Sequence, residues 1–164
     1  VEPLRQRRLG ALEALSDRLL IDGTTGLFNR RYMEQRLRAE LARASRHGHP
    51  LSLLLVLVEG KQGRLRAEEV GSLAQLFGTE PTAAPFSFRR SDVCARSGLE
   101  RFMVILPETP KWGAITKAER LRRAVGDQDL AQAKIGVAAF PEDASDLQSL
   151  LLAAESSLEQ ARRT

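Results

Sequence analysis

The sequence feature that most constrains the fold is an apolar run from Leu51 to Val58, interrupted only by Ser52 and ended by a glycine at position 60. The run is far too short to cross a bilayer. Its length and its even hydrophobicity instead favour a strand that is buried on both faces. Because such a strand needs a covering layer on each side, the chain is expected to fold as helices packed on a sheet.

The rest of the chain supplies helix and strand patterns around this run. Their order is helix, strand, helix, strand, strand, helix, strand, helix, which indicates an α/β (α+β) domain with a central, mainly antiparallel sheet flanked by helices. A tight turn at 97–100 predicts a hairpin. Helices are predicted over 29–46, 66–77 and 147–162, and a further helix begins at 110. Strands are predicted over 51–58, 92–96, 101–107 and 134–140, and loops over 79–87 and 141–146.

Two details of this assignment can be tested. Thr109 is the predicted N-cap of the third helix, with Pro110 at its first position. The inner face of that helix is predicted to consist of Ile115, Ala118, Leu121 and Val125.

The chain divides into an N-terminal helix, residues 1–21, and one domain, residues 22–164, a size that fits a single compact unit. Leu12, Leu15 and Leu19 give the N-terminal helix a narrow apolar stripe among arginines. Such a stripe suits a short coiled-coil stalk or linker, and equally a helix packed on its own domain.

The charge and composition of the chain limit the classes of ligand and partner that it is expected to bind. The net charge of +4 attracts anions of several kinds. Aromatic residues are 5% of the chain, and no recognition helix or base-stacking platform is visible, so nucleic acid is disfavoured. The single cysteine, Cys94, excludes an internal disulfide and suggests a cytoplasmic setting with Cys94 as a small core residue. His47 and His49 are interpreted as solvated turn residues, not metal ligands.

Three runs resemble the GGDEF (diguanylate cyclase) family, in the family's order. They are DGTTGLFNRRYMEQRLRAELARASRHGHPLSLLLV, ARSGLERFMVILPET and IGVAAFPEDASDLQSLLLAAESSLEQAR. Together they cover nearly the whole chain. The resemblance implies a nucleotidyl-cyclase palm with a ferredoxin-like core.

The resemblance also implies where catalysis would occur, and there the chain departs from the pattern. The signature hairpin reads Gly98-Leu99-Glu100-Arg101-Phe102. Leu99 replaces a glycine, Arg101 replaces the metal-binding glutamate, and Leu57 aligns with the metal aspartate. Only Glu59 and Glu100 remain acidic nearby, whereas two-metal phosphoryl transfer needs several converging carboxylates. A degenerate active site, with no bound metal and no cofactor, is therefore expected.

The family's inhibitory site is retained. Arg89 and Asp92 match its R-x-x-D motif, and Arg120 matches a further arginine of that site. Arg43 matches the arginine by which a neighbouring protomer closes over the ligand, whereas Thr116 stands where some members carry another arginine. These residue types suit guanine, because arginine donates to O6 and N7 and a carboxylate accepts from N1–H and N2–H₂. The alternative is an ordinary solvated ion pair.

The resemblance thus favours a non-catalytic receptor for cyclic di-GMP, a bacterial second messenger. Ligand binding would be relayed through a bridged homodimer or a partner protein or domain, as in the degenerate receptor domains of exopolysaccharide secretion systems. The main alternative is a structural or dimerisation module that binds no nucleotide. A weak residual cyclase is a third hypothesis, disfavoured by Leu57 and Arg101.

Overall fold

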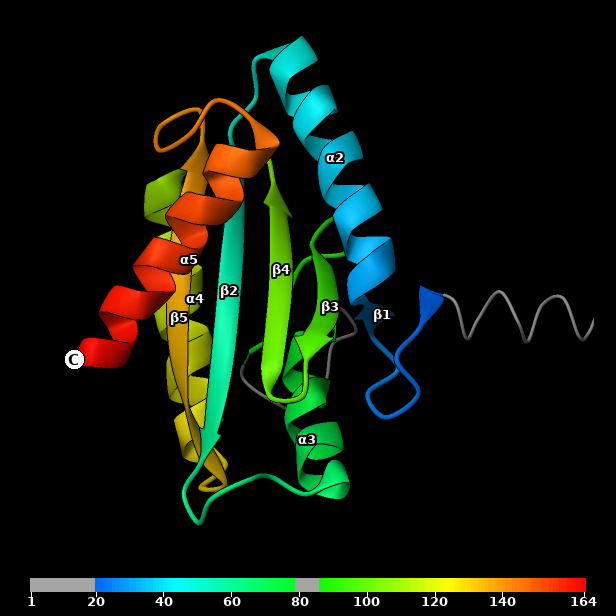
Figure 1. Ribbon diagram of the computed structural model, residues 1–164, viewed down its shortest axis with the longest axis vertical. Coiled ribbons are helices and arrows are strands. Elements are labelled where there is room, and N and C mark those ends of the chain that lie inside the picture. The colour runs from blue at the N-terminus through cyan, green and yellow to red at the C-terminus, as the bar shows by residue number, and fades with distance from the viewer. Residues whose placement is uncertain (1–19, 79–85) are drawn as a thin grey trace, which may run out of the picture.

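The computed structural model describes residues 20–78 and 86–164 (Figure 1). All but the last two residues of the predicted N-terminal helix, 1–21, and most of the predicted loop over 79–87, lie outside these ranges. Within the described ranges, no helix is long and apolar enough to cross a membrane.

A five-stranded sheet forms the centre of the domain, in the order β1-β3-β4-β2-β5. The central strand β2 runs antiparallel to both of its neighbours, and β3 and β4 form the predicted hairpin. The short strand β1, which the sequence did not predict, pairs with β3 in parallel. The strands are β1 Phe28–Asn29, β2 Leu51–Gly60, β3 Val93–Gly98, β4 Arg101–Pro107 and β5 Ala131–Phe140.

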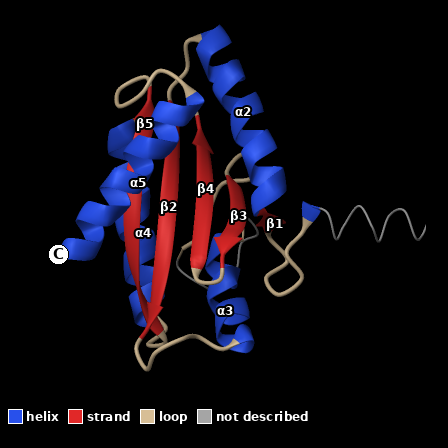
Figure 2. Ribbon diagram, in the orientation of Figure 1, coloured by secondary structure: helices blue, strands red, loops and turns tan. Residues whose placement is uncertain are grey.

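Helices cover both faces of the sheet (Figure 2). They are α2 Arg30–His47, α3 Ala67–Ala74, α4 Lys111–Asp127 and α5 Leu147–Arg163, and α3 continues into a 3₁₀ turn, Gln75–Phe77. Alternate residues of β2 belong to two separate cores. Leu53 and Leu55 pack with α2 and α5, whereas Leu54 and Val56 pack with α3 and α4. The predictions of a mainly antiparallel sheet and of a strand buried on both faces are confirmed.

Individual residues determine where α2 begins and ends and how closely α5 packs on the sheet. The Asn29 side chain caps α2 by accepting a hydrogen bond from the Tyr32 N–H at 2.9 Å, and α2 ends at Gly48 in the left-handed conformation, with φ 69°. Gly136 lets α5 lie directly on β5, because a Cβ at this position would lie 2.4 Å from the carbonyl oxygen of Ala154.

Two predictions for α4 were wrong. Pro110, not Thr109, is the N-cap, and the helix begins at Lys111. Thr109 does not cap because its hydroxyl donates to the carbonyl oxygen of Pro107 and accepts a hydrogen bond from Arg89. Ile115 is 51% exposed and does not belong to the inner face, where Ala114 is fully buried instead.

Candidate functional site

A pocket of about 240 Å³ lies where the chain enters β3, beside the first turns of α4. Both residues of the R-x-x-D motif line it. Its lining residues are Arg89, Asp92, Leu106, Glu108, Thr109, Pro110, Trp112, Gly113 and Lys117.

Aromatic packing holds the segment that leads into this pocket. Phe86 and Phe88 are buried and meet edge to face, with ring centroids 4.9 Å apart. The ring of Phe77, which stacks on Phe102 at 4.3 Å, lies 5.9 Å from that of Phe88. Aromatic pairs at these separations contribute beyond their buried area, so the backbone next to Arg89 is firmly anchored. The sequence analysis assigned Phe86 to a loop and missed this cluster.

Asp92 closes the turn that carries Arg89. Its carboxylate accepts a hydrogen bond from the Arg89 backbone N–H at 2.8 Å and another from Arg89 Nη2 at 3.1 Å. The Asp92 backbone N–H returns a bond to the Arg89 carbonyl oxygen at 3.0 Å. The Asp92 side chain is fully buried. A buried carboxylate is stable here because both of its oxygens accept hydrogen bonds.

The Arg89 guanidinium is held by protein acceptors at Nη2 and has open donors at its other nitrogens. Besides Asp92, its Nη2 atom donates to the carbonyl oxygen of Pro107 at 3.0 Å and to Thr109 Oγ1 at 2.6 Å. The Arg89 side chain is 51% exposed. In the described part of the chain no acceptor pairs with its Nε or Nη1 atoms. The guanidinium is therefore fixed in position with N–H donors left for an outside acceptor.

Lys117 adds positive charge to the same surface. Its ammonium lies 5.5 Å from the ring centroid of Phe88 and 5.6 Å from that of Phe86, within the range of cation–π attraction. Burial lowers the pKa of Lys117. The Asp92 carboxylate opposes that shift, whereas the positive charges of Arg89 and Arg120 add to it. Three cations therefore face one buried carboxylate, which favours an anionic ligand.

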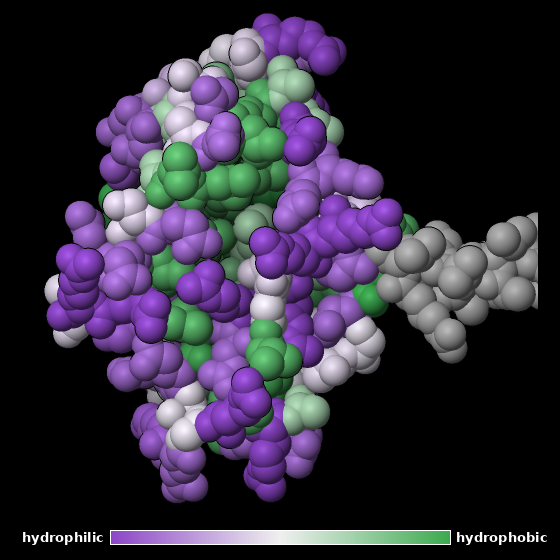
Figure 3. All heavy atoms as spheres, in the orientation of Figure 1, coloured by the Kyte–Doolittle hydropathy of each residue, from purple (hydrophilic) through white to green (hydrophobic). Residues whose placement is uncertain are grey.

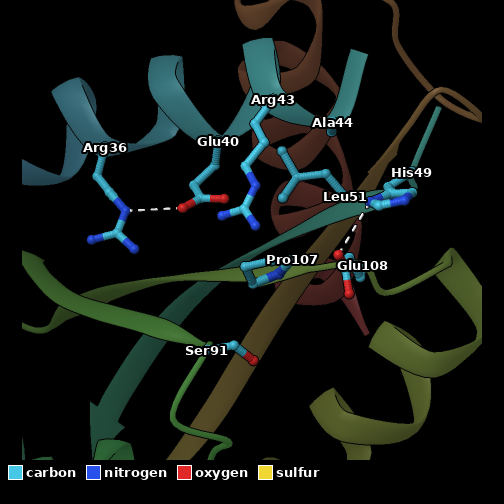
Figure 4. A pocket seen from close by; sticks show the side chains of 9 residues that line it. All are labelled: Arg36, Glu40, Arg43, Ala44, His49, Leu51, Ser91, Pro107 and Glu108. Atoms are coloured by element: carbon cyan, nitrogen blue, oxygen red, sulfur yellow. Dashed lines mark hydrogen bonds and ion pairs between the residues drawn. The ribbon is translucent and has the colours of Figure 1, made fainter. Parts of the chain in front are cut away.

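The other two predicted ligand residues lie outside this pocket. Arg120 is exposed on α4, within electrostatic reach of Lys117. Arg43 lies in a neighbouring pocket of about 280 Å³ between α2 and the end of β4 (Figure 4). The two pockets share Glu108, whose carboxylate pairs with His49 Nδ1 at 3.1 Å. The structure thus brings Arg89, Asp92 and Arg120 to one region and leaves Arg43 beside it.

The opposite end of the sheet carries the hairpin residues. Leu57 of β2 lies in register with Arg101 of β4, and Arg101 pairs with Glu155 of α5 at 3.5 Å. Glu100 uses its carboxylate to accept a hydrogen bond from the Leu65 backbone N–H at 3.1 Å. Among residues 20–78 and 86–164, no three His, Cys, Asp or Glu side chains are grouped to hold a metal ion.

Arg96, which the sequence analysis did not single out, fixes the hairpin turn. Its Nε and Nη2 atoms donate to the carbonyl oxygens of Gly98 at 3.1 Å and Leu99 at 2.6 Å. Its Nη1 atom donates to Asp22 at 3.4 Å. The Leu99 side chain projects into solvent and is 64% exposed. The hairpin carbonyls are thus already bonded within the protein.

Comparison with known proteins agrees with this geometry. The family model described as "Diguanylate cyclase, GGDEF domain" matches residues 19–60 and 85–164. "Probable diguanylate cyclase DgcC" of Escherichia coli K12 is 29% identical over 161 residues, which is 93% of this chain and 42% of that protein. "Response regulator PleD" of Caulobacter vibrioides NA1000 is 29% identical over 153 residues, 86% of this chain and 33% of that protein. The chain thus spans less than half of these relatives.

Solved structures show the same fold. The coiled coil and GGDEF domain of DgcB from Caulobacter crescentus, in complex with c-di-GMP, aligns with a TM-score of 0.80 at 20% identity, covering 99% of this chain and 90% of that one. The FimX GGDEF domain from Pseudomonas aeruginosa aligns with a TM-score of 0.70 at 22% identity, covering 88% of this chain and 94% of that one. The family model matches well over half of the residues, and the sheet and helices follow the same plan, so this chain belongs to the GGDEF (diguanylate cyclase) family.

Proposed function

We propose that this domain is a non-catalytic receptor that binds cyclic di-GMP at the pocket of Arg89 and Asp92. The observation that carries the proposal is the state of Arg89, which is fixed by three protein acceptors while its Nε and Nη1 donors stay open. The nearby charges of Lys117 and Arg120 suit the phosphates of a dinucleotide. The cyclic di-GMP complex of the related DgcB domain supports the choice of ligand.

Guanine recognition by this pocket has two parts. Arg89 donates to the O6 and N7 atoms of guanine, the common specific contact to that base. Asp92 accepts from guanine N1–H and N2–H₂, but its carboxylate is fully buried beneath Arg89. The second contact therefore requires the Arg89 side chain to move aside from Asp92. Binding would exchange an internal ion pair for two contacts to the base.

The same proposal holds that the domain does not synthesise the dinucleotide. Leu57 and Arg101 lie opposite one another where the family resemblance places metal-binding carboxylates. The remaining acid of the hairpin, Glu100, is bonded to a backbone N–H of the loop that follows β2. A phosphoryl-transfer centre needs metal ions that bridge the phosphates and neutralise their charge. This end of the sheet offers an arginine and a leucine in place of that ligand set.

The proposed signal passes through association with a second protein surface. Arg43 lies in a separate pocket, which shares only Glu108 with the ligand pocket. Its proposed role is to contact ligand held by a neighbouring protomer. The diguanylate cyclase SiaD, 26% identical with a TM-score of 0.71, is described in complex with its activator SiaC. A partner protein or domain is therefore the other proposed recipient. Sedimentation with and without ligand separates a bridged dimer from a single occupied chain.

Calorimetric titration with cyclic di-GMP tests the proposal directly. Arg89→Ala should cost about 2–4 kcal/mol of binding free energy, because it removes a charged donor and leaves the guanine edge unpaired. That corresponds to about 30-fold to 1,000-fold in affinity. Cyclic di-AMP should bind poorly, since adenine lacks the donor pair that Asp92 accepts.

Arg90→Ala is the matched control for that titration, because Arg90 is an exposed neighbour with the same charge. An equal loss from both variants would indicate general electrostatics and not this site. The absence of any heat with the unmodified domain would favour the second candidate, a structural or dimerisation module that binds no nucleotide.

A further inference from the structure

We propose that Trp112 is a base-stacking platform at the mouth of the pocket, on which one guanine of the dinucleotide lies while Arg89 bonds its edge. This inference rests on the proposed function and adds a subsite to it. It assigns to Trp112 a stacking contribution to affinity that does not depend on the base, and it leaves base preference to Arg89 and Asp92.

The exposure of Trp112 is the first support. Its side chain is 75% exposed in the first turn of α4, although tryptophan is highly buried on average in folded proteins. The other large exposed hydrophobic residues of the described ranges are Leu99, Ile115 and Leu152. Of these four side chains, only Trp112 lines the pocket that contains Arg89. An exposed indole beside an open guanidinium marks a place for a ligand with an aromatic face.

The backbone around Trp112 leaves room for a flat ligand. Gly113 also lines the pocket, and a Cβ there would lie 3.2 Å from Thr109 Cγ2. Glycine inside a helix is less stable than alanine by roughly 1 kcal/mol, so its presence indicates a steric need. The next turn of α4 contributes Lys117 to the same pocket. Gly113 therefore adds no side chain to the pocket beside the indole.

Charge and aromatic surface together match a nucleotide. Lys117 lines the same pocket as Trp112 and stays beside Arg89 and Arg120, which places cations next to the stacking surface. A base on Trp112 therefore has positive charge within reach of its phosphate. Stacking tolerates any base, because every base has a π face. Discrimination between guanine and adenine must then come from the polar groups at the base edge, Arg89 and Asp92.

The test uses the fact that Trp112 is the only tryptophan of the chain. Cyclic di-GMP is titrated in parallel by calorimetry and by tryptophan fluorescence. We expect saturable quenching with the same midpoint as the heat. Trp112→Ala should weaken binding about 5-fold to 150-fold, the range for losing one base–aromatic stack. Trp112→Phe should keep most of the affinity, whereas Trp112→Leu, apolar without a π face, should not.

Leu152→Ala is the control, because Leu152 is a similarly exposed apolar side chain on α5. The preference for cyclic di-GMP over cyclic di-AMP should be the same in Trp112→Phe as in the unmodified domain. Heat from the unmodified domain together with equal affinity for Trp112→Ala and Leu152→Ala would overturn the stacking inference and leave the receptor function standing. No heat from the unmodified domain would overturn both.

Discussion

The two ends of the sheet carry similar polar residues and use them in opposite ways. At the end where β3 begins, Arg89 is anchored through one nitrogen and keeps its other donors open. At the hairpin end, Arg96 spends its three nitrogens on Gly98, Leu99 and Asp22. Arg96 lies in β3 and Arg89 in the turn that leads into it, so the difference comes from the groups that surround each side chain.

This difference concerns which polar groups the fold leaves available to a ligand. A residue serves a ligand only if its own fold leaves donors or acceptors unsatisfied at the surface. At the hairpin end the polar side chains are paired within the protein: Glu100 accepts a hydrogen bond from the Leu65 N–H, and Arg101 forms an ion pair with Glu155. The other end holds its carboxylate inside and presents cations outward. The side of the molecule over α2 and α5 is largely polar around an apolar hollow (Figure 3).

The largest effect in this comparison should come from Asp92. Asp92→Ala removes the acceptor for the Arg89 N–H and guanidinium, so the free energy of unfolding should fall by about 1–3 kcal/mol. Ligand binding should be lost as well, because Arg89 is no longer positioned. Urea denaturation and calorimetry measure the two effects. Glu100→Ala, which removes a single acceptor at the hairpin end, should cost less stability and leave binding intact. A larger loss of stability from Glu100→Ala than from Asp92→Ala would contradict the proposed difference between the two ends of the sheet.

A smaller, pH-dependent effect is expected from Asp22. Burial alone would raise the pKa of Asp22, but hydrogen bonds from Thr25 and the charge of Arg96 outweigh it and hold the pKa below its ordinary value of 3.8. A lowered pKa stabilises the fold above the unfolded-state value, and that stability disappears as pH falls through the folded-state value. Asp22→Asn should therefore cost about 1 kcal/mol at neutral pH.

Urea titrations at a series of pH values check the Asp22 prediction. The difference in free energy of unfolding between Asp22→Asn and the unmodified domain should shrink as the pH falls below 3.8. Asp127→Asn, which also removes one carboxylate but an exposed one, is the control. A gap that stays constant into acid would mean that Asp22 acts through shape and not through its charge.

Local patterns predicted most of the fold, and tertiary contacts explain what they missed. The strand at Leu51–Val58 and the hairpin follow from hydrophobic pattern and turn residues, and the structure confirms both. Thr109 carried a valid capping signal, but its hydroxyl is used by Arg89 from twenty residues away. Arg96 likewise meets Asp22 across 74 positions. No local pattern reports such pairs.

The candidate site shows the same limit. The motif spacing located Arg89 and Asp92 in one pocket, because four consecutive residues cannot separate far. The exposure of Trp112 and the contact of Lys117 with Phe88 depend on how α4 packs against distant segments. The sequence alone therefore predicted that Arg89 and Asp92 lie together, but not the exposure of Trp112 or the aromatic contacts of Lys117.

The smallest expected effect is the absence of one. With GTP and Mg²⁺ or Mn²⁺, the unmodified domain should form no cyclic di-GMP above a protein-free blank, and neither should Leu57→Asp, Arg101→Glu or the double variant. A new carboxylate at position 57 would face Arg101 in register and form an ion pair with it. In the double variant the two new carboxylates would lie near Glu155, which would have lost its ion pair with Arg101. Glu100 would stay bonded to the Leu65 N–H, and the carbonyl oxygens of the hairpin turn would stay bonded to Arg96. Like charges in one place repel unless a cation is held there, and phosphoryl transfer also requires the nucleotide to be positioned. Cyclic di-GMP formed by the unmodified domain would contradict the proposal of a non-catalytic receptor. Cyclic di-GMP formed by the double variant alone would show that Leu57 and Arg101 are the only side chains that prevent catalysis at the hairpin end.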